Sequence, residues 1–319
     1  MAPGTPPLIT VFGGGGFIGR YVCEALLKAG ARLRVAEREP RRAFFLQPLG
    51  EMGQVTTVRA DLARPATIER AVEGASAVIN LVGIFKGNLD AIHVAGAGKA
   101  AAAAREVGAS AFVQVSAIGA DPASTSDYGR TKGLGEQAVR QAFAGATIIR
   151  PSVVFGPEDE FTNRFASMAR LPILPVIAPR TRFQPIYVRD LGRAIAAAAL
   201  DPKRHGGKTY ELAGPEALTM RELNGRIAGM AGHKPEIVDV PDFLASGMAS
   251  LGFLPGAPLT RDQWIMLQRD NVPAAGAPGL AAFGIEPTPL GAVAPNWLGR
   301  FVKGGRFAPR AATDGNVAA

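Results

Sequence analysis

Cysteine, histidine and long apolar runs are scarce in this sequence of 319 residues. The single cysteine, Cys23, excludes an internal disulfide and any metal site built from several cysteines. The three histidines, His93, His205 and His233, show no spacing typical of metal ligands, so we expect no metal site. No run of about 18 uncharged apolar residues occurs, which predicts that no segment spans a membrane.

Targeting features are also lacking at the start of the chain. Residues 1–7 precede the first apolar run and contain neither a basic segment nor an amphipathic pattern rich in arginine and serine. Such a start is not typical of a cleaved signal or transit peptide. We therefore expect the protein to act in the compartment in which it is made.

Acidic residues are outnumbered, with 27 Asp and Glu against 35 Lys and Arg, which gives a formal net charge of +8. An arginine-rich surface favours anionic partners such as a membrane surface, an acidic protein or a nucleic acid. No nucleic-acid-recognition motif and no stripe of aromatic and basic residues is present, so we expect no nucleic-acid partner. Ordinary solvated faces would also account for the charge.

Apolar runs alternate with helical patterns through the first two-thirds of the chain. The expected strands are Leu8–Phe12, Leu33–Ala36, Val55–Val58, Ala77–Val82, Phe112–Ser116 and Thr147–Arg150. The expected helices are Ile18–Ala29, a stretch around Arg41–Leu49, Thr67–Glu73, Asn88–Val107 and Gly129–Phe143. Near-continuous apolar strands are typical of a parallel sheet that helices cover on both faces. The alternation therefore predicts an α/β fold with a doubly wound parallel sheet of the Rossmann type.

This rhythm ends after Arg150, where short elements with frequent Pro and Gly predict a smaller, mainly helical C-terminal lobe. The capping patterns at Thr219–Glu222 and Thr260–Gln263 each predict a helix. Thr288 and Pro289 predict the cap and first position of a last helix that ends near Val302.

These patterns divide the chain into parts. We expect a Rossmann domain over residues 1–200, of which 155–185 reaches toward the second lobe. The smaller lobe should then cover residues 201–307, and 308–319 should form a loose tail.

A glycine-rich turn joins the first expected strand to the first expected helix. Its glycines follow the pattern G-x-x-G-x-x-G, the spacing of short-chain dehydrogenases. Side chains at the first two positions would block the approach of a phosphate to the backbone, and the third glycine allows close packing of helix and strand. The free N–H groups at the start of the helix attract an anion. We therefore predict that this turn cradles the pyrophosphate of a nicotinamide dinucleotide, with contacts from Gly13, Gly16, Phe17, Ile18 and Gly19.

The ends of the next strands supply further expected contacts with the nucleotide. Glu37 follows the second strand, where a carboxylate would accept a hydrogen bond from the ribose 2′-hydroxyl of NADH. Arg38 follows it and would pair with the 2′-phosphate of NADPH, so these two residues leave both nucleotides open. Asp61 and Leu62 would contact the adenine, and Leu81, Val82 and Gly83 would lie beside the nicotinamide.

Ser116, Tyr128 and Lys132 form a candidate catalytic trio. Ser116 ends the fifth strand, and the i, i+4 spacing places Tyr128 and Lys132 on one face of the next helix. Lys132 could lower the tyrosine pKa and hold the ribose, while Tyr128 acts as general acid and base. A Y-x-x-x-K pattern also occurs by chance, and its presence alone does not demonstrate turnover.

Two later segments carry candidate site residues. The segment Arg150–Pro157, with Pro151 and Val153, resembles the strand end that extended short-chain dehydrogenases place beside the nicotinamide. Arg180 and Arg182 stand at the entrance to another apolar strand. These arginines could meet an anionic substrate, a partner or solvent.

Several motifs together resemble the Rossmann-type accessory subunit of respiratory complex I, the NADH:quinone oxidoreductase. The segments that carry this resemblance are Val11–Gly19, Asn80–Gly83, Val115–Gly119, Arg150–Asp159, Asn163–Ala166, Arg182–Pro185, Leu259–Gln263, Asp270–Val272 and Gly284–Thr288. The resemblance runs from about residue 8 to residue 307, and its later segments are more specific than the glycine motif and the Tyr/Lys pair.

The resemblance implies an atypical short-chain dehydrogenase-like subunit on the peripheral arm near the membrane, with the other complex I subunits as partners. It also implies tightly held NADPH as a mainly structural cofactor, with Arg38 on the 2′-phosphate; Glu37 departs from that expectation. With no transit peptide expected, it implies a bacterial version on the cytoplasmic face of the inner membrane.

The apolar segment Pro241–Leu254 suits such a placement. It carries several large apolar side chains and little charge beyond Asp242, and basic residues follow at Arg300, Lys303, Arg306 and Arg310. A segment of this kind could rest in a bilayer interface or in a groove of another subunit. A helix packed within the C-terminal lobe is the alternative.

Three functions therefore remain open. The first is a non-catalytic complex I subunit with resident NADPH. The second is a free-standing NAD(P)-dependent epimerase, dehydratase or reductase that uses the Ser116, Tyr128 and Lys132 trio. The third is a redox-sensing scaffold, which requires different partner affinities for the two states of the nucleotide.

Overall fold

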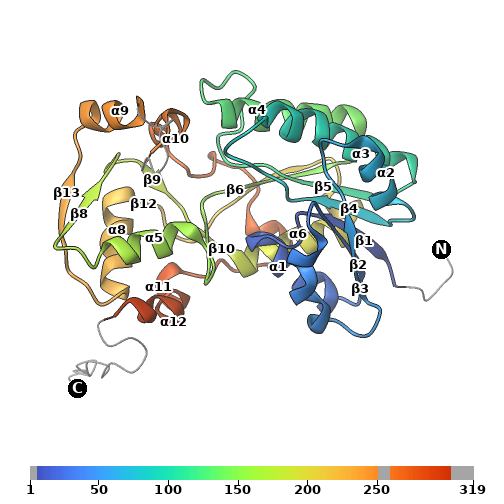
Figure 1. Ribbon diagram of the computed structural model, residues 1–319, viewed down its shortest axis with the longest axis horizontal. Coiled ribbons are helices and arrows are strands. Elements are labelled where there is room, and N and C mark those ends of the chain that lie inside the picture. Colours follow the sequence, from blue (N-terminus) through green and yellow to red (C-terminus); the bar gives the residue numbers. More distant parts are fainter. Residues whose placement is uncertain (1–5, 251–258, 303–319) are drawn as a thin grey trace.

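The computed structural model describes residues 6–250 and 259–302, which form two lobes lying side by side (Figure 1). The larger lobe is built on a seven-stranded sheet in the order β11-β6-β5-β4-β1-β2-β3, with every neighbouring pair parallel. Its strands are β1 (Leu8–Phe12), β2 (Arg32–Glu37), β3 (Val55–Arg59), β4 (Ala77–Asn80), β5 (Ala111–Val115), β6 (Thr147–Pro151) and β11 (Thr209–Leu212). The predicted doubly wound parallel sheet is confirmed.

Helices cover both faces of this sheet. The helices of the larger lobe are α1 (Phe17–Lys28), η1 (Pro40–Leu49), α2 (Pro65–Val72), η2 (Asp90–Gly96), α3 (Ala97–Glu106), α4 (Asp127–Ala142), α6 (Val188–Leu200), α7 (Pro202–His205) and η3 (Leu280–Phe283). Helices α1 and α6 pack on one face, and α2, α3 and α4 pack on the other (Figure 1). Two apolar cores result, one on each side of the sheet, and the central strands β4 and β5 are buried on both sides.

Two of the expected helices differ in type from the prediction. The stretch around Arg41–Leu49 is a 3-10 helix that contains Pro48, whose missing N–H is incompatible with regular α-helical bonding. The expected helix Asn88–Val107 begins instead with the π-helical turn η2 and continues as α3. Within η2, Gly96 lies so close to Leu62 that a Cβ on the glycine would be 2.7 Å from the leucine Cβ.

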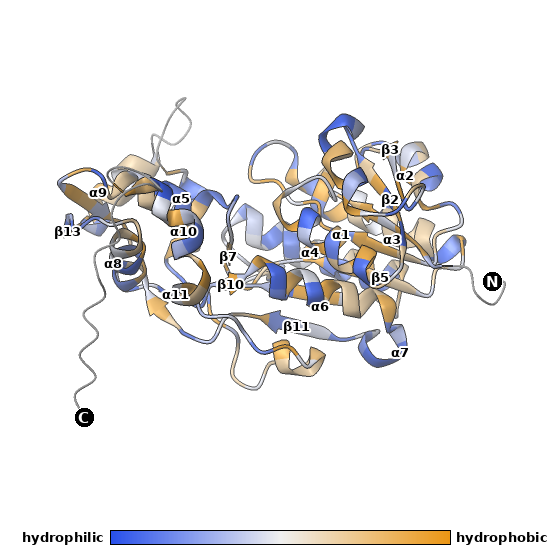
Figure 2. Cartoon of the chain, turned by 90° about the horizontal axis from the view of Figure 1, so that it is seen from below, coloured by the Kyte–Doolittle hydropathy of each residue, from blue (hydrophilic) through white to orange (hydrophobic). Residues whose placement is uncertain are grey.

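The smaller lobe combines short helices with two-stranded ladders. Its elements, with the β7 and β10 pair at the junction of the lobes, are β7 (Val154–Phe155), α5 (Glu160–Met168), β8 (Ile173–Val176), β9 (Arg182–Phe183), β10 (Ile186–Tyr187), β12 (Leu218–Thr219), α8 (Met220–Met230), β13 (Glu236–Asp239), α9 (Asp242–Ser250), α10 (Arg261–Leu267), α11 (Leu290–Val293), α12 (Pro295–Leu298) and η4 (Gly299–Phe301). Its core gathers Phe155, Leu174, Leu223 and Trp297 from separate parts of the chain. Hydrophobic and hydrophilic residues alternate along the helices of both lobes (Figure 2).

The predicted capping boxes are confirmed. Thr219 caps α8 with Glu222, and Thr260 caps α10 with Gln263. The prediction of one long last helix is wrong, because Pro295 has no N–H to continue it and begins a new short helix. The predicted cap is also one residue early, because Pro289 rather than Thr288 is the N-cap of α11.

The expected domain boundary at residue 200 lies before the last strand of the large sheet, because β11 pairs with β6. Residues of the expected reach 155–185 pack in the core of the smaller lobe, Phe155 and Phe183 among them. The expected tail 308–319 lies outside the described residues, as do Lys303, Arg306 and Arg310.

Candidate functional site

The glycine turn has the geometry of an anion cradle. Gly13 adopts φ +78°, a conformation that favours glycine. A Cβ on Gly19 would stand 2.4 Å from the Gly13 carbonyl oxygen, so only glycine permits α1 to approach the turn this closely. Gly16 is the N-cap of α1, and neither a side-chain cap nor an acidic residue in the first turn satisfies this helix start. The first turn of α1, which begins at Phe17 and Ile18, therefore offers free N–H groups and partial positive charge.

The end of β2 is tied to this turn through Glu37. Its carboxylate Oε1 accepts a hydrogen bond of 2.6 Å from the backbone N–H of Gly15. Burial raises the pKa of Glu37, while Arg42 and Arg38 lower it through their charges. Arg38 itself is exposed. The side of the site where we expect the adenosine ribose thus combines a carboxylate already bonded to the glycine turn with two guanidinium groups.

The residues after β3 are less available than expected. The Asp61 carboxylate accepts a hydrogen bond from the Ala63 backbone N–H at 3.0 Å, which closes the local turn. Leu62 is buried and belongs to the core around α2 and α3. Their contact with an adenine stays a prediction.

The residues after β4 lie between the glycine turn and the trio. The Val82 backbone N–H donates to the Asn80 side chain at 3.1 Å, and a Cβ on Gly13 would be 3.4 Å from the Val82 Cγ2. On the other side, a Cβ on Gly83 would be 3.7 Å from the Lys132 Nζ. Leu81 packs against the core on the α1 side. These residues therefore connect the two halves of the site.

The structure brings the trio to the same end of the sheet. Ser116 follows β5 and is buried, and its Oγ has no hydrogen-bond partner among the described residues. The Lys132 Nζ donates to the Val115 carbonyl at 2.8 Å and lies 5.9 Å from the centre of the Tyr128 ring. An unpartnered buried hydroxyl is costly, so its position fits a site where a ligand supplies the partner.

The electrostatics of the trio differ from the expectation. Burial raises the pKa of Tyr128 to about 12, whereas we expected Lys132 to lower it. Burial also lowers the pKa of Lys132 to about 8. Lys132 thus remains largely charged at neutral pH, but its charge does not offset the effect of burial on the Tyr128 pKa.

The segment after β6 joins the site at the junction of the lobes. Pro151 ends β6, and its carbonyl accepts from the backbone N–H of Ile118, which follows Ser116. The Val153 backbone N–H donates to the Asn271 side chain at 2.8 Å. Of Arg180 and Arg182 at the entrance to β9, Arg182 pairs with Asp270 at 2.8 Å.

The family model of the NAD dependent epimerase/dehydratase family matches residues 9–213, which include the glycine turn and the trio. The chain belongs to this family. It is also 34% identical over 291 residues to the mouse mitochondrial protein named NADH dehydrogenase (ubiquinone) 1 alpha subcomplex subunit 9, with 88% of this chain and 77% of the mouse protein covered. The chain therefore belongs with that subunit inside the larger family.

A second relative is an enzyme by name. The Ceramide reductase of Caulobacter vibrioides is 32% identical over 248 residues, which cover 76% of each chain. Among solved structures, the Citrobacter sp. triphenylmethane reductase complexed with NADP(H) has a TM-score of 0.73 at 18% identity, covering 91% of this chain and 99% of that chain. The structural likeness shows the shared fold.

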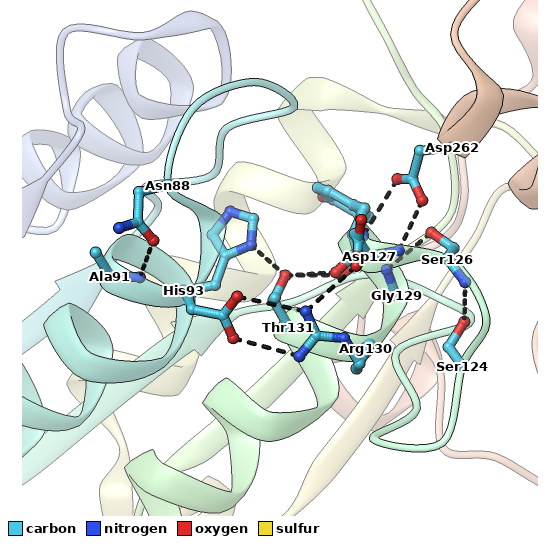
Figure 3. Close-up of polar contacts among 12 residues, drawn as sticks. Asn88, Ala91, His93, Ser124, Ser126, Asp127, Gly129, Arg130, Thr131 and Asp262 are labelled. Carbon is cyan, nitrogen blue, oxygen red and sulfur yellow. Dashed lines mark hydrogen bonds and ion pairs between the residues drawn. The ribbon is translucent and has the colours of Figure 1, made fainter. Parts of the chain in front are cut away.

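In this family member, a histidine that the sequence analysis did not assign to the site lies beside the tyrosine helix (Figure 3). The His93 Nε2 accepts from the Ile84 backbone N–H at 3.0 Å, so the neutral ring carries its proton on Nδ1 and donates to the Thr131 Oγ1 at 2.9 Å. Burial and the charge of Lys132 lower the pKa of His93 to about 4, which keeps the ring neutral. His93 thereby ties the loop after β4 to helix α4.

Phe85 was also not expected at the site. Its ring stacks on Tyr128 with 4.6 Å between ring centres and 15° between planes, although Phe85 remains 62% exposed. Its place in a loop after an apolar strand gave no sequence signal for this contact.

The cavity beside Tyr128 is small. It measures about 50 Å³ and is lined by Tyr128, Lys132, Ile265 and Met266, among others. Small-molecule sites usually measure about 300–1,000 Å³. The cavity is therefore much smaller than a typical small-molecule site.

Within the described ranges 6–250 and 259–302, no helix is long and apolar enough to cross a bilayer. The same ranges hold no group of three or more His, Cys, Asp or Glu side chains placed to bind a metal ion.

Proposed function

We propose that this chain is an accessory subunit of respiratory complex I that holds NADPH as a mainly structural cofactor and stabilises the peripheral arm near the membrane. The observation that carries the proposal is the 34% identity to the mouse subunit over 88% of this chain. The other complex I subunits are the proposed partners. The proposed location is the cytoplasmic face of a bacterial inner membrane.

The nucleotide site supports resident NADPH. Gly13, Gly16, Phe17, Ile18 and Gly19 would hold the pyrophosphate at the start of α1. Arg38, assisted by Arg42, would bind the 2′-phosphate, and the desolvated Glu37 carboxylate would remain bonded to Gly15. The contacts proposed for the rest of the nucleotide come from Asp61, Leu62, Leu81, Val82, Gly83, Ser116, Tyr128, Lys132, Pro151 and Val153.

Two features support retention without turnover. Bound NADPH offers a hydride at its dihydronicotinamide ring, and reduction of a carbonyl would also need a proton donor and room for the substrate. Burial raises the pKa of Tyr128 to about 12, so its hydroxyl stays protonated but is a weaker acid than an unperturbed tyrosine. The cavity beside it measures only about 50 Å³. Helix α4 and its trio therefore suit a structural role better than catalysis.

The outer end of the smaller lobe supports a contact with the membrane surface or a neighbouring subunit. Helix α9 packs through Ala245 and Ala249, both buried. Phe243, Leu244 and Met248 face away and are 74%, 50% and 38% exposed. The helix lies at the end of the lobe away from the large sheet (Figures 1 and 2). Exposed apolar side chains on a basic protein suit an anionic bilayer interface.

The test is native mass spectrometry of the protein extracted from its own membranes. We expect the chain to co-purify with other complex I subunits and to carry one NADPH. A chain found only as a free species would contradict the proposal. Tyr128→Phe, which keeps the ring that stacks on Phe85, should leave complex assembly and quinone reduction unchanged.

A second candidate function is a free-standing reductase, favoured by the 32% identity to the Caulobacter Ceramide reductase and by the complete trio. In that case purified protein should oxidise NADPH in the presence of a ceramide-type carbonyl substrate, and Tyr128→Phe should abolish the reaction. The same variant thus separates the two functions.

A further inference from the structure

One segment of the smaller lobe crosses back over the trio of the larger lobe. We call residues 260–273 the strap; it contains helix α10, whose capping box at Thr260 and Gln263 defines its start. Residues on the strap line the cavity beside Tyr128, and Ile265 and Met266 supply its apolar wall. The strap therefore covers the cavity beside Tyr128 and Lys132.

Asp262 fastens the strap to the tyrosine helix. Its carboxylate accepts from the backbone N–H of Asp127 at 2.6 Å and from that of Tyr128 at 3.2 Å (Figure 3). These N–H groups belong to the first turn of α4, where a negative charge is also favoured by the helix dipole. The side chain of Ser126 caps α4 by accepting from Gly129, and Asp262 supplies the partners of the two preceding N–H groups, which have none within the helix.

The other end of the strap is fastened independently at the junction of the lobes. The Asn271 side chain accepts from the Ser152 hydroxyl at 2.7 Å and from the Val153 backbone N–H at 2.8 Å. Asp270 accepts from both the backbone and the guanidinium of Arg182, each at 2.8 Å. The strap therefore makes more polar contacts at its Asp270 and Asn271 end than Asp262 makes with α4.

The two ends therefore differ in strength. Residues 270 and 271 are held by several polar contacts with residues near the lobe junction, and the Leu267 carbonyl accepts from the Thr181 hydroxyl at 2.6 Å. Helix α10 also packs against α9, but among the described residues its hydrogen bonds to α4 are the two made by Asp262. Where few polar contacts join a segment to its neighbour, the segment separates from that neighbour most easily, so the strap should separate from α4 at Asp262.

We propose that the strap closes over the nicotinamide half of the nucleotide site as a clasp. The contact of Asp262 with the start of α4, its catch, holds the strap closed. While Asp262 holds the start of α4, Ile265 and Met266 close the space beside Tyr128 and Lys132. Release of bound nucleotide then requires the catch to open. This inference rests on the proposed function, since it explains how a resident NADPH is kept.

The experiment measures the release rate of NADPH from the full chain, followed by the loss of its bound-state fluorescence after addition of excess NADP⁺. We expect Asp262→Ala to raise the release rate by about 10-fold or more, as befits the loss of hydrogen bonds to a charged group. Arg261→Ala, an exposed change of charge at the neighbouring position of the same helix, is the control and should leave the rate unchanged.

Two further measurements guard against a general loss of folding. Asp262→Asn keeps one oxygen acceptor without the charge, so its release rate should lie between those of the wild type and Asp262→Ala. Hydrogen exchange of the amides of Asp127 and Tyr128 should be faster in Asp262→Ala, while exchange in the central strand β4 stays slow.

The outcomes separate this inference from the proposed function. Unchanged release in both Asp262 variants, with NADPH bound, would overturn the clasp alone. Faster exchange throughout β4 in Asp262→Ala would mean that this substitution unfolds the protein. The Asp262→Asn variant then decides: intermediate release supports the clasp, and wild-type release overturns it. A wild-type chain that binds no NADPH would overturn the proposed function and the clasp together.

Discussion

The carboxylate of Glu37 accepts a 2.6 Å hydrogen bond from the backbone N–H of Gly15, so the tip of β2 and the glycine turn form one unit. The sequence alone left two partners open, the ribose 2′-hydroxyl of NADH for this carboxylate or the 2′-phosphate of NADPH for Arg38. The structure gives one of its oxygens a partner within the protein and surrounds the group with positive charge from Arg42 and Arg38. Glu37 can therefore shape the turn whichever nucleotide is bound.

Nucleotide preference should depend on Arg38. We expect Arg38→Ala to weaken NADPH binding by about 10-fold or more, because a charge-assisted contact with the 2′-phosphate is lost, and to leave NADH binding nearly unchanged. Isothermal titration with both nucleotides measures this. Arg32→Ala, at the opposite end of β2, is the matched control. Equal losses for the two nucleotides would rule out the assigned phosphate contact.

Two buried serines should respond in opposite ways. Ser116→Ala removes a hydroxyl without a partner among the described residues, so the free protein should keep its Tm while nucleotide raises that Tm less than in the wild type. Ser152→Ala removes a hydroxyl bonded to Asn271 and should destabilise the free protein by about 1–3 kcal/mol. Thermal denaturation with and without NADPH tests both. A lower Tm of free Ser116→Ala would contradict this assignment.

Stability should fall in mild acid through His93. Its pKa is lowered from 6.5 to about 4 in the folded protein, so the unfolded chain binds more protons between these values. The stability that depends on neutral His93 is therefore fully present above pH 6.5 and is lost as the pH falls toward 4. We expect His93→Gln to be less stable at neutral pH but to lose less stability over that interval. Urea denaturation across this range checks the difference, and parallel curves for the two proteins would refute it.

The close approach of α1 to the turn should make Gly19 irreplaceable. A Cβ there would stand 2.4 Å from one backbone oxygen and 2.5 Å from another, so Gly19→Ala should cost several kcal/mol, of the order of a severe overpacking, and abolish nucleotide binding. Gly229→Ala is the control, since this glycine of α8 has nothing within 4 Å of its added Cβ and the change should stabilise the helix by up to about 1 kcal/mol. Denaturant titration of both variants is the measurement. A stable Gly19→Ala protein that still binds NADPH would show that α1 can shift.

Sequence reasoning succeeded where structure depends on nearby residues. The strands from β1 to β6 and helix α1 follow from apolar periodicity, and the capping boxes at Thr219 and Thr260 follow from side chains three residues apart. It failed where a helix is interrupted or begins with another helix type. Pro295 divides the expected last helix, and the expected helix Asn88–Val107 begins as the π-helical turn that carries His93.

The parallel sheet, the glycine turn and the positions of the trio follow from the amino-acid sequence, because strand and helix periodicity and the need for glycine depend on neighbouring residues. The state of the site depends on how distant segments pack. Burial reverses the expected pKa shift of Tyr128, and Asp262 reaches the start of α4 from a position 135 residues away from Asp127. Desolvation and contacts between distant segments arise only when the chain folds, so no local sequence pattern predicts them.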